Sequence, residues 1–159
     1  MRMVYTVLAF AVAGLVVVQA AAIAFAVFGL SAWIEQGGTL DAAAMQNEVT
    51  FPGVVGFMIH GMFGSMVIPA VALLLLISSF FARTAGAVRW GLIVFVTTAV
   101  QVALGIFAHG VPQLGILHGI LALVLFGAAV MAGLQGRRKG AAVTTSVGVE
   151  TAAAPVAHA

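Results

Sequence analysis

Long apolar runs separated by short polar breaks dominate this 159-residue chain. A helix needs about 20 predominantly apolar residues to cross a bilayer, and four runs meet that length. We expect spans over residues 4–30, 53–82, 88–108 and 114–135. The pattern therefore predicts an all-α fold. We expect an integral membrane protein whose four helices form an up-and-down bundle, as one domain over residues 1–136.

The two ends of the chain need separate interpretation. Arg2 followed by an apolar run and the small residues of "VVVQAAAIA" is also typical of a secretory signal peptide. The run continues to Leu30, about twice the usual length of such a signal, which favours a retained helix. Residues 137–159 are rich in alanine and weakly polar, so we expect a disordered cytoplasmic tail in which His158 is incidental.

Fixed charges at the breaks predict the orientation. The cations that follow the second span and flank the third and fourth are Arg83, Arg89, Arg137, Arg138 and Lys139. The break between the first two spans instead contains only acids, namely Glu35, Asp41 and Glu48. Because Lys and Arg accumulate in short cytoplasmic loops, we expect a multi-pass protein of the cell membrane with both termini cytoplasmic.

Composition narrows the classes of partner. The chain is 64% hydrophobic and 6% charged, whereas about a quarter of the residues of soluble domains are charged. Its mean hydropathy is +1.24, so the lipid bilayer is its first partner. Six scattered cations cannot form a track for nucleic acid. The absence of cysteine removes thiolate metal sites and covalent haem attachment.

Three histidines, each followed by glycine, lie within the apolar runs: His60, His109 and His118. At about 1.5 Å per residue, each lies about 30 Å from the cytoplasmic arginines, near the outer edge of the membrane. Since the second and fourth spans run parallel, His60 and His118 can face each other across the bundle. His109 closes the antiparallel third span, nearer to water.

Ionisable groups within spans are expensive and usually mark ion paths, proton relays or cofactors. For His60 and His118 we consider a cofactor pair, interhelical hydrogen bonding, and proton or metal handling. Zinc would want three or four ligands with carboxylate or thiolate help, whereas haem needs two neutral imidazoles and an apolar slot. Among these alternatives we favour the cofactor pair, and haem b or another haem type is the cofactor that His60 and His118 would suit. His109 is either a polar interfacial residue or a further metal ligand.

Small and polar residues surround the two histidines. Gly53, Gly56 and Gly64 share the helix face of His60, and Gly115 and Ala122 share that of His118. Such faces allow close helix packing and also leave room over a flat ring. Gln101 could donate to a haem propionate or to another helix, and Gln19 has the same two alternatives. We count Gly64, Gly115 and Gln101 with the histidines as cofactor-binding candidates, and expect Pro69 to kink the second span.

Two strings carry a family resemblance. "QVALGIFAHGVPQLGILHGILALVLFGAAV" resembles the third and fourth helices of a haem A synthase half, with a Gln-x-x-Leu-Gly step, a turn containing proline and a histidine entering an aliphatic helix. "MIHGMFGSMV" resembles the second helix of that family, and the likeness covers about residues 53–135. The matching residues are His60, Gly64, Arg83, Gln101, Leu104, Gly105, Pro112 and His118.

The resemblance implies a four-helix bundle that holds haem with His60 and His118 as axial ligands of the iron. In the family, two such halves are fused, and the substrate half has a glutamate three residues before its first histidine and an arginine just after it. This chain has Phe57 and Gly61 there, and it lacks the second half and the loop cysteines. Oxidation of a haem methyl group is therefore not implied.

These observations favour a b-type cytochrome-like protein for electron transfer or haem handling near the outer face, with a redox partner or a larger respiratory complex. A diverged, half-length haem A synthase-like enzyme that acts as a homodimer is the first alternative. A cofactor-free structural or assembly subunit is the second.

Overall fold

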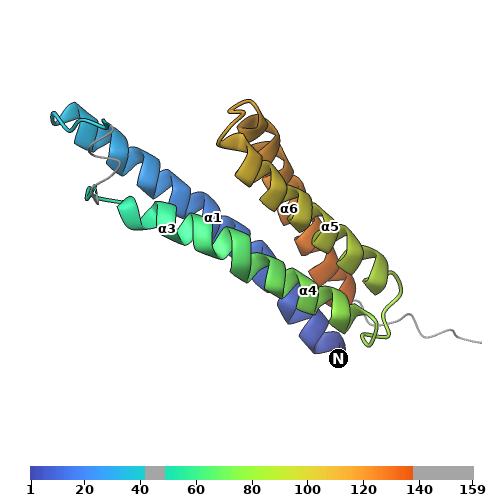
Figure 1. Cartoon of the computed structure of the whole chain (residues 1–159). Helices are drawn as coiled ribbons and strands as arrows, with labels where there is room; N and C mark the ends of the chain where they lie inside the picture. Colours follow the sequence, from blue (N-terminus) through green and yellow to red (C-terminus); the bar gives the residue numbers. More distant parts are fainter. Residues whose placement is uncertain (42–48, 138–159) are drawn as a thin grey trace, which may run out of the picture.

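A computed structural model describes residues 1–41 and 49–137 of the chain (Figure 1). Its helices are α1 (Arg2–Glu35), α3 (Val54–Met62), η1 (Phe63–Val67), α4 (Ile68–Ser79), α5 (Ala87–Ala108) and α6 (Leu114–Arg137). Within this part of the chain four continuous helical segments are long and apolar enough to cross a membrane. The predicted all-α, up-and-down membrane fold is confirmed. Apart from Arg137, the predicted tail lies outside the described residues.

The helix ends differ from the predicted spans by a few residues. α1 continues to Glu35 instead of Leu30, and the second segment ends at Ser79 instead of residue 82. Arg83, with φ 51°, turns the chain after this segment. A positive φ is uncommon for a residue other than glycine.

Pro69 leaves a mark on the second segment, although the helix is not broken. α3 passes through the π-helical turn η1 into α4, where Pro69 lies in the first turn. Proline lacks an N–H and its ring clashes with the carbonyl four residues earlier, here that of Ser65, which lies inside η1. A π turn accommodates this clash by widening the hydrogen-bonded ring.

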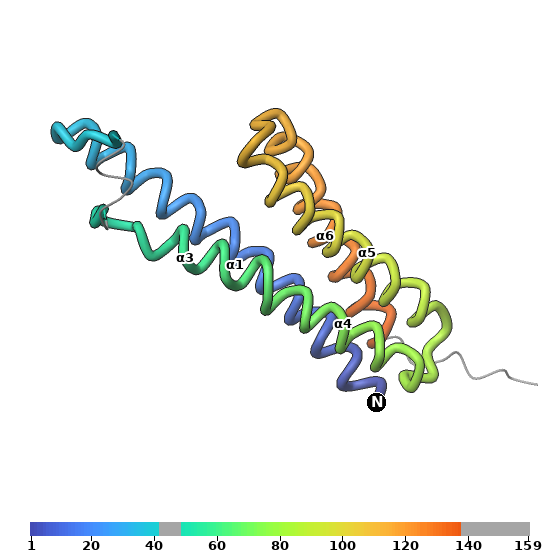
Figure 2. Tube along the Cα trace, in the orientation of Figure 1, coloured from blue at the N-terminus to red at the C-terminus, as the bar shows by residue number. Residues whose placement is uncertain are grey.

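Around the bundle, α1 packs on α4, α4 on α5, and α5 on α6. The ring closes where α6 packs on α1 (Figure 2). The core lies toward one end of the bundle, which carries Arg2, Arg83 and Arg137 and which we call the arginine end. Tyr5, Val12, Leu75, Val94 and Leu125 fill this core and are at most 2% exposed.

Two side chains tie the arginine end together. The Tyr5 hydroxyl donates to Ala87 O at 3.3 Å and joins α1 to the start of α5. The Gln135 Nε2 donates to Ala85 O at 3.0 Å and joins α6 to the turn between α4 and α5. The turn that contains Arg83 is therefore held against both α1 and α6.

Toward the opposite end, which we call the far end, the bundle separates into two helix pairs. Figure 1 shows α1 with α3 diverging from α5 with α6. α3 packs closely on α1, because a Cβ on Gly56 would collide with the carbonyl oxygen of Ala22. In contrast, residues 101–108 of α5 and 114–124 of α6 include no buried residue.

Candidate functional site

His60 and His118 meet where the two helix pairs begin to diverge. Both lie near the start of helices that begin at the far end, α3 and α6. The centroids of their imidazole rings are 6.1 Å apart, with an interplanar angle of 65°. Both side chains are half-buried. The structure thus brings together two residues that are far apart in the sequence.

Main-chain contacts fix the tautomer of His118. Its Nδ1 lies 3.0 Å from the carbonyl oxygen of Gln101 on α5. A carbonyl oxygen only accepts hydrogen bonds, so Nδ1–H is the donor and Nε2 keeps its lone pair. The Gln101 Nε2 in return donates to His118 O at 2.9 Å. Two hydrogen bonds therefore hold α6 to α5.

His60 repeats this arrangement on the other helix pair. Its Nδ1 lies 3.2 Å from the carbonyl oxygen of Gln19 on α1. In one orientation the Gln19 Nε2 donates weakly to Ile59 O at 3.5 Å. In the other, Nε2 donates to His60 O at 3.0 Å and Oε1 accepts from the Gly64 N–H at 3.2 Å.

The second orientation of Gln19 competes for the His60 proton. It brings Nε2 to 2.8 Å from His60 Nδ1, where the amide would donate to the ring. Nδ1 would then accept, and the proton would sit on Nε2. Donation from Nδ1–H to Gln19 O instead leaves Nε2 free. The Gln19 amide therefore selects the tautomer of His60.

Gln101 differs from Gln19 in one respect. Its Oε1 is buried and has no hydrogen-bond partner within the described part of the chain. Gln19 has the Gly64 N–H in the π turn within its reach, whereas α6 is regular after His118. The Gln101 Nε2 is already used on His118 O, so this residue braces the histidine rather than pointing a free donor into the site.

The predicted glycines divide into two groups. A Cβ on Gly64 would lie 3.6 Å from Gln19 Oε1, and one on Gly53 would lie 2.5 Å from Phe25 O. Close helix packing is therefore the explanation for Gly53, as for Gly56, and Gly64 adjoins the Gln19 amide. Gly115, three residues before His118, has no atom within 4 Å of an added Cβ in the described structure.

Gly105 gives the His118 ring its room. A Cβ at this position on α5 would lie 3.1 Å from His118 Cε1 and 3.3 Å from Nδ1. Any larger side chain would move the imidazole.

His109 lies outside the pair. It is exposed at the end of α5, and its Nδ1 contacts only carbonyl oxygens of its own helix, those of Gly105 at 3.0 Å and Ile106 at 3.2 Å. This position agrees with a polar residue at the membrane surface, the first of the two alternatives that the sequence left.

The donor set can be compared with what a metal requires. Across the residues that the structure describes, no three or more of His, Asp and Glu gather in one place. The site offers two imidazoles, whose ring centroids are 6.1 Å apart in an edge contact. A haem iron, which takes four further ligands from its ring, fits a site of two histidines better than zinc does.

Gln19 is the site residue whose role the sequence left open. Each helix pair contains one glutamine within its first helix and one histidine near the start of its second: Gln19 with His60, and Gln101 with His118. All four residues can be found in the sequence. The glutamine and the histidine are 41 residues apart in one pair and 17 in the other, so the equivalence of the two pairs is recognised only when the helices are packed.

No family model, curated protein or solved structure matches the chain. The likeness to the haem A synthase family thus rests on the quoted strings alone.

Proposed function

We propose that this four-helix membrane protein binds haem, as a b-type cytochrome does, through the Nε2 atoms of His60 and His118. The observation that carries the proposal is the pair of facing imidazoles, 6.1 Å between centroids, with each Nδ1 directed at a main-chain carbonyl. Metal-binding histidines commonly donate their other ring N–H in this way, which fixes the tautomer and the ring orientation.

The surroundings of the pair support a flat apolar ligand. Beyond the histidines the two helix pairs diverge, and the facing segments of α5 and α6 bury no residue. Gly115 leaves open space beside His118. Apolar helix faces without a protein partner suit a porphyrin, which is itself apolar except at its propionates.

The chemistry follows from the ligand count. A haem held by His60 and His118 would supply a one-electron couple, and two protein ligands would favour electron transfer over oxygen activation. The chain's own residues orient the rings. Gln101 O keeps Nδ1 of His118 protonated, and Gln19 O does the same for His60 when the Gln19 amide does not donate to that ring. The Gln101 amide fixes α5 to α6. Electron transfer or haem handling is the activity that these residues serve.

Charge supports the proposed orientation. Arg83, Arg89 and Arg137 lie at the arginine end. Glu35 is the last residue of α1, at the opposite end, and Asp41 follows it in the chain. With the arginine end in the cytoplasm, the site lies in the outer half of the membrane, where an external redox partner or respiratory subunit would reach it.

The visible spectrum of the full-length protein, purified from haem-replete cells and recorded oxidised and reduced, tests the proposal. We expect a Soret band, and a spectrum of the reduced protein that is typical of haem iron with two nitrogen ligands from the protein. The absence of a Soret band would contradict the proposal. Pyridine haemochrome analysis with mass spectrometry identifies the haem. A formylated product would instead support the alternative of a half-length synthase-like enzyme acting as a dimer.

A further inference from the structure

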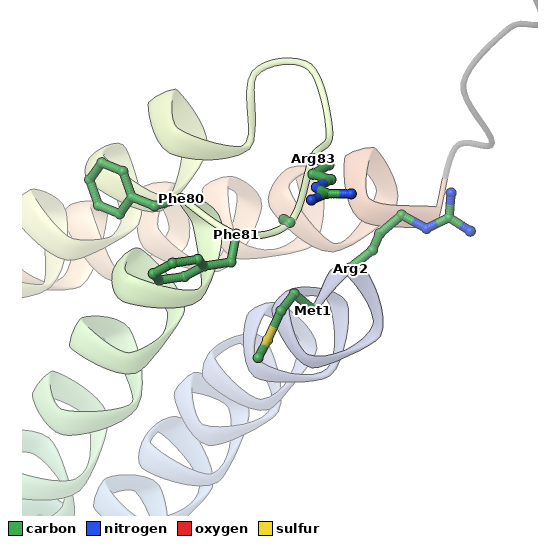
Figure 3. Close-up of a pocket in the computed structure, with 6 residues that line it drawn as sticks. Met1, Arg2, Phe80, Phe81 and Arg83 are labelled. Carbon is green, nitrogen blue, oxygen red and sulfur yellow. The ribbon is translucent and has the colours of Figure 1, made fainter.

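A pocket at the arginine end combines two arginines with apolar side chains. It is open and lies between the start of α1 and the turn after α4 (Figure 3). Met1, Arg2, Phe80, Phe81, Ala82 and Arg83 line it, and none of them is acidic. From these residues we infer that the pocket binds the phosphate headgroup of an anionic phospholipid. The inference does not depend on haem binding.

The two arginines supply the charge. Both guanidinium groups lie on the same side of the pocket, with Phe81 and Met1 on the other (Figure 3). Among the described residues neither side chain makes an ion pair or a hydrogen bond. Arg137 is engaged differently, with its guanidinium 5.8 Å from the centre of the Phe10 ring. Two unpaired guanidinium groups over an apolar wall suit a phosphodiester, whose oxygens accept from both.

The level of the pocket matches the headgroup layer. Arg2 begins the first apolar segment, and Arg83 follows the end of the second. Phe80 and Phe81, directly before this turn, are 64% and 60% exposed and are positioned to contact acyl chains. Clusters of Arg and Lys at this boundary attract anionic lipids electrostatically.

The site is held in place before any lipid binds. Tyr5 on α1 and Gln135 on α6 each donate to a carbonyl of the short segment from Ala85 to Ala87. These bonds fix the turn that carries Arg83 beside the helix that carries Arg2. The backbones of both arginines are therefore held at the pocket without the lipid.

The backbone of Arg83 is unusual for a residue with a side chain. Its φ of 51° is one that glycine adopts without strain and that a side-chain-bearing residue adopts at a cost. A left-handed position within a turn is usually occupied by glycine or asparagine. An arginine at such a position is better explained by what its charge does than by the turn.

Native mass spectrometry of the full-length protein in detergent, titrated with phosphatidylglycerol or phosphatidylcholine, tests the inference. Phosphatidylglycerol should bind more tightly, and Arg2→Gln and Arg83→Gly should each weaken it about five-fold. Arg83→Gly relieves the backbone, so this variant should unfold at a temperature no lower than wild type in lipid-free detergent. Its loss of binding would then not be a loss of fold.

Two controls complete the test. Arg83→Lys keeps the charge and should retain most of the affinity. Arg89→Gln removes a nearby exposed cation that does not line the pocket, and should leave binding unchanged. Equal binding of the two lipids, or an Arg89→Gln variant as weak as Arg83→Gly, would overturn the inference. Displacement of the lipid by inorganic phosphate at constant ionic strength would also overturn it, because the site would then bind free phosphate.

Discussion

Gln101 and His118 hold each other through two reciprocal hydrogen bonds, from the Gln101 amide to His118 O at 2.9 Å and from His118 Nδ1–H to Gln101 O at 3.0 Å. The ring orientation is thus set by main-chain atoms, and only the brace depends on the glutamine side chain. Gln19 and His60 repeat the relationship on the other side of the site.

The first prediction concerns the histidines. His60→Ala and His118→Ala should each abolish or strongly alter the haem absorbance, because each removes one axial nitrogen. His109→Ala should leave the spectrum largely intact, since this exposed ring contacts only its own helix. Spectra of the three purified variants check this. A wild-type spectrum in either of the first two would show that the ligands are assigned wrongly.

The two glutamines should behave unequally. Gln101→Leu removes one interhelical hydrogen bond and an unpaired buried oxygen, so we expect a loss of only about 0.6 kcal/mol in unfolding free energy. Gln19→Leu also leaves the Gly64 N–H without its side-chain partner, so the unfolding free energy should fall by about 1 kcal/mol more than in Gln101→Leu. Unfolding in mixed micelles by titration with sodium dodecyl sulfate measures both values.

The same Gln19→Leu variant tests the tautomer argument. The variant lacks the side-chain amide that competes for Nδ1, so His60 should donate only to the main-chain carbonyl oxygen of residue 19. Haem should then be retained at least as well as in wild type. Loss of haem from a variant that remains folded would contradict this account of His60.

Gly115 separates space for a ligand from space for packing. An added side chain meets no atom within 4 Å there, so Gly115→Leu should fold as wild type but lose haem. Gly127→Leu is the matched control, because it adds the same side chain to α6 at another open position, nine residues beyond His118. Haem content per folded protein is the measurement. Equal haem in the two variants would place the ligand elsewhere.

Gly56 should be intolerant for the opposite reason. Gly56→Ala drives a methyl group into the carbonyl of Ala22, and overpacking of this kind costs about 2 kcal/mol. Because α3 would have to move off α1, haem binding at His60 should weaken as well. Gly61→Ala adds the same methyl group where no atom lies within 4 Å, and should be neutral in both assays. A stable Gly56→Ala protein would mean that α3 is not seated on α1 as described.

Tyr5→Phe examines the arginine end. The hydroxyl of this fully buried ring bonds to Ala87 O, and its removal should cost about 1 kcal/mol in unfolding free energy. Ser31→Ala removes an exposed hydroxyl that bonds only within its own helix, and should have little effect. The same micelle titration measures both variants. Equal unfolding free energies for Tyr5→Phe and wild type would contradict the hydrogen bond between α1 and α5.

Hydropathy and charge predicted the four helices to within a few residues, since length and apolar content alone decide whether a segment can span a bilayer. Helix direction and depth pointed to His60 facing His118, the two residues that the structure brings together. The roles of Gln19 and Gly56 could not be predicted in this way. Both depend on how closely α3 approaches α1, which is a tertiary contact that neither periodicity nor composition records.

The core that joins all four segments lies at the arginine end, whereas the buried packing at the far end joins α3 to α1 alone. The buried cluster and the ties from Tyr5 and Gln135 hold all four segments whether or not the histidines are occupied. Folding of the chain is therefore separable from any binding at the histidines. Under the haem proposal, the empty protein would be a folded acceptor for the ligand, not an unfolded precursor.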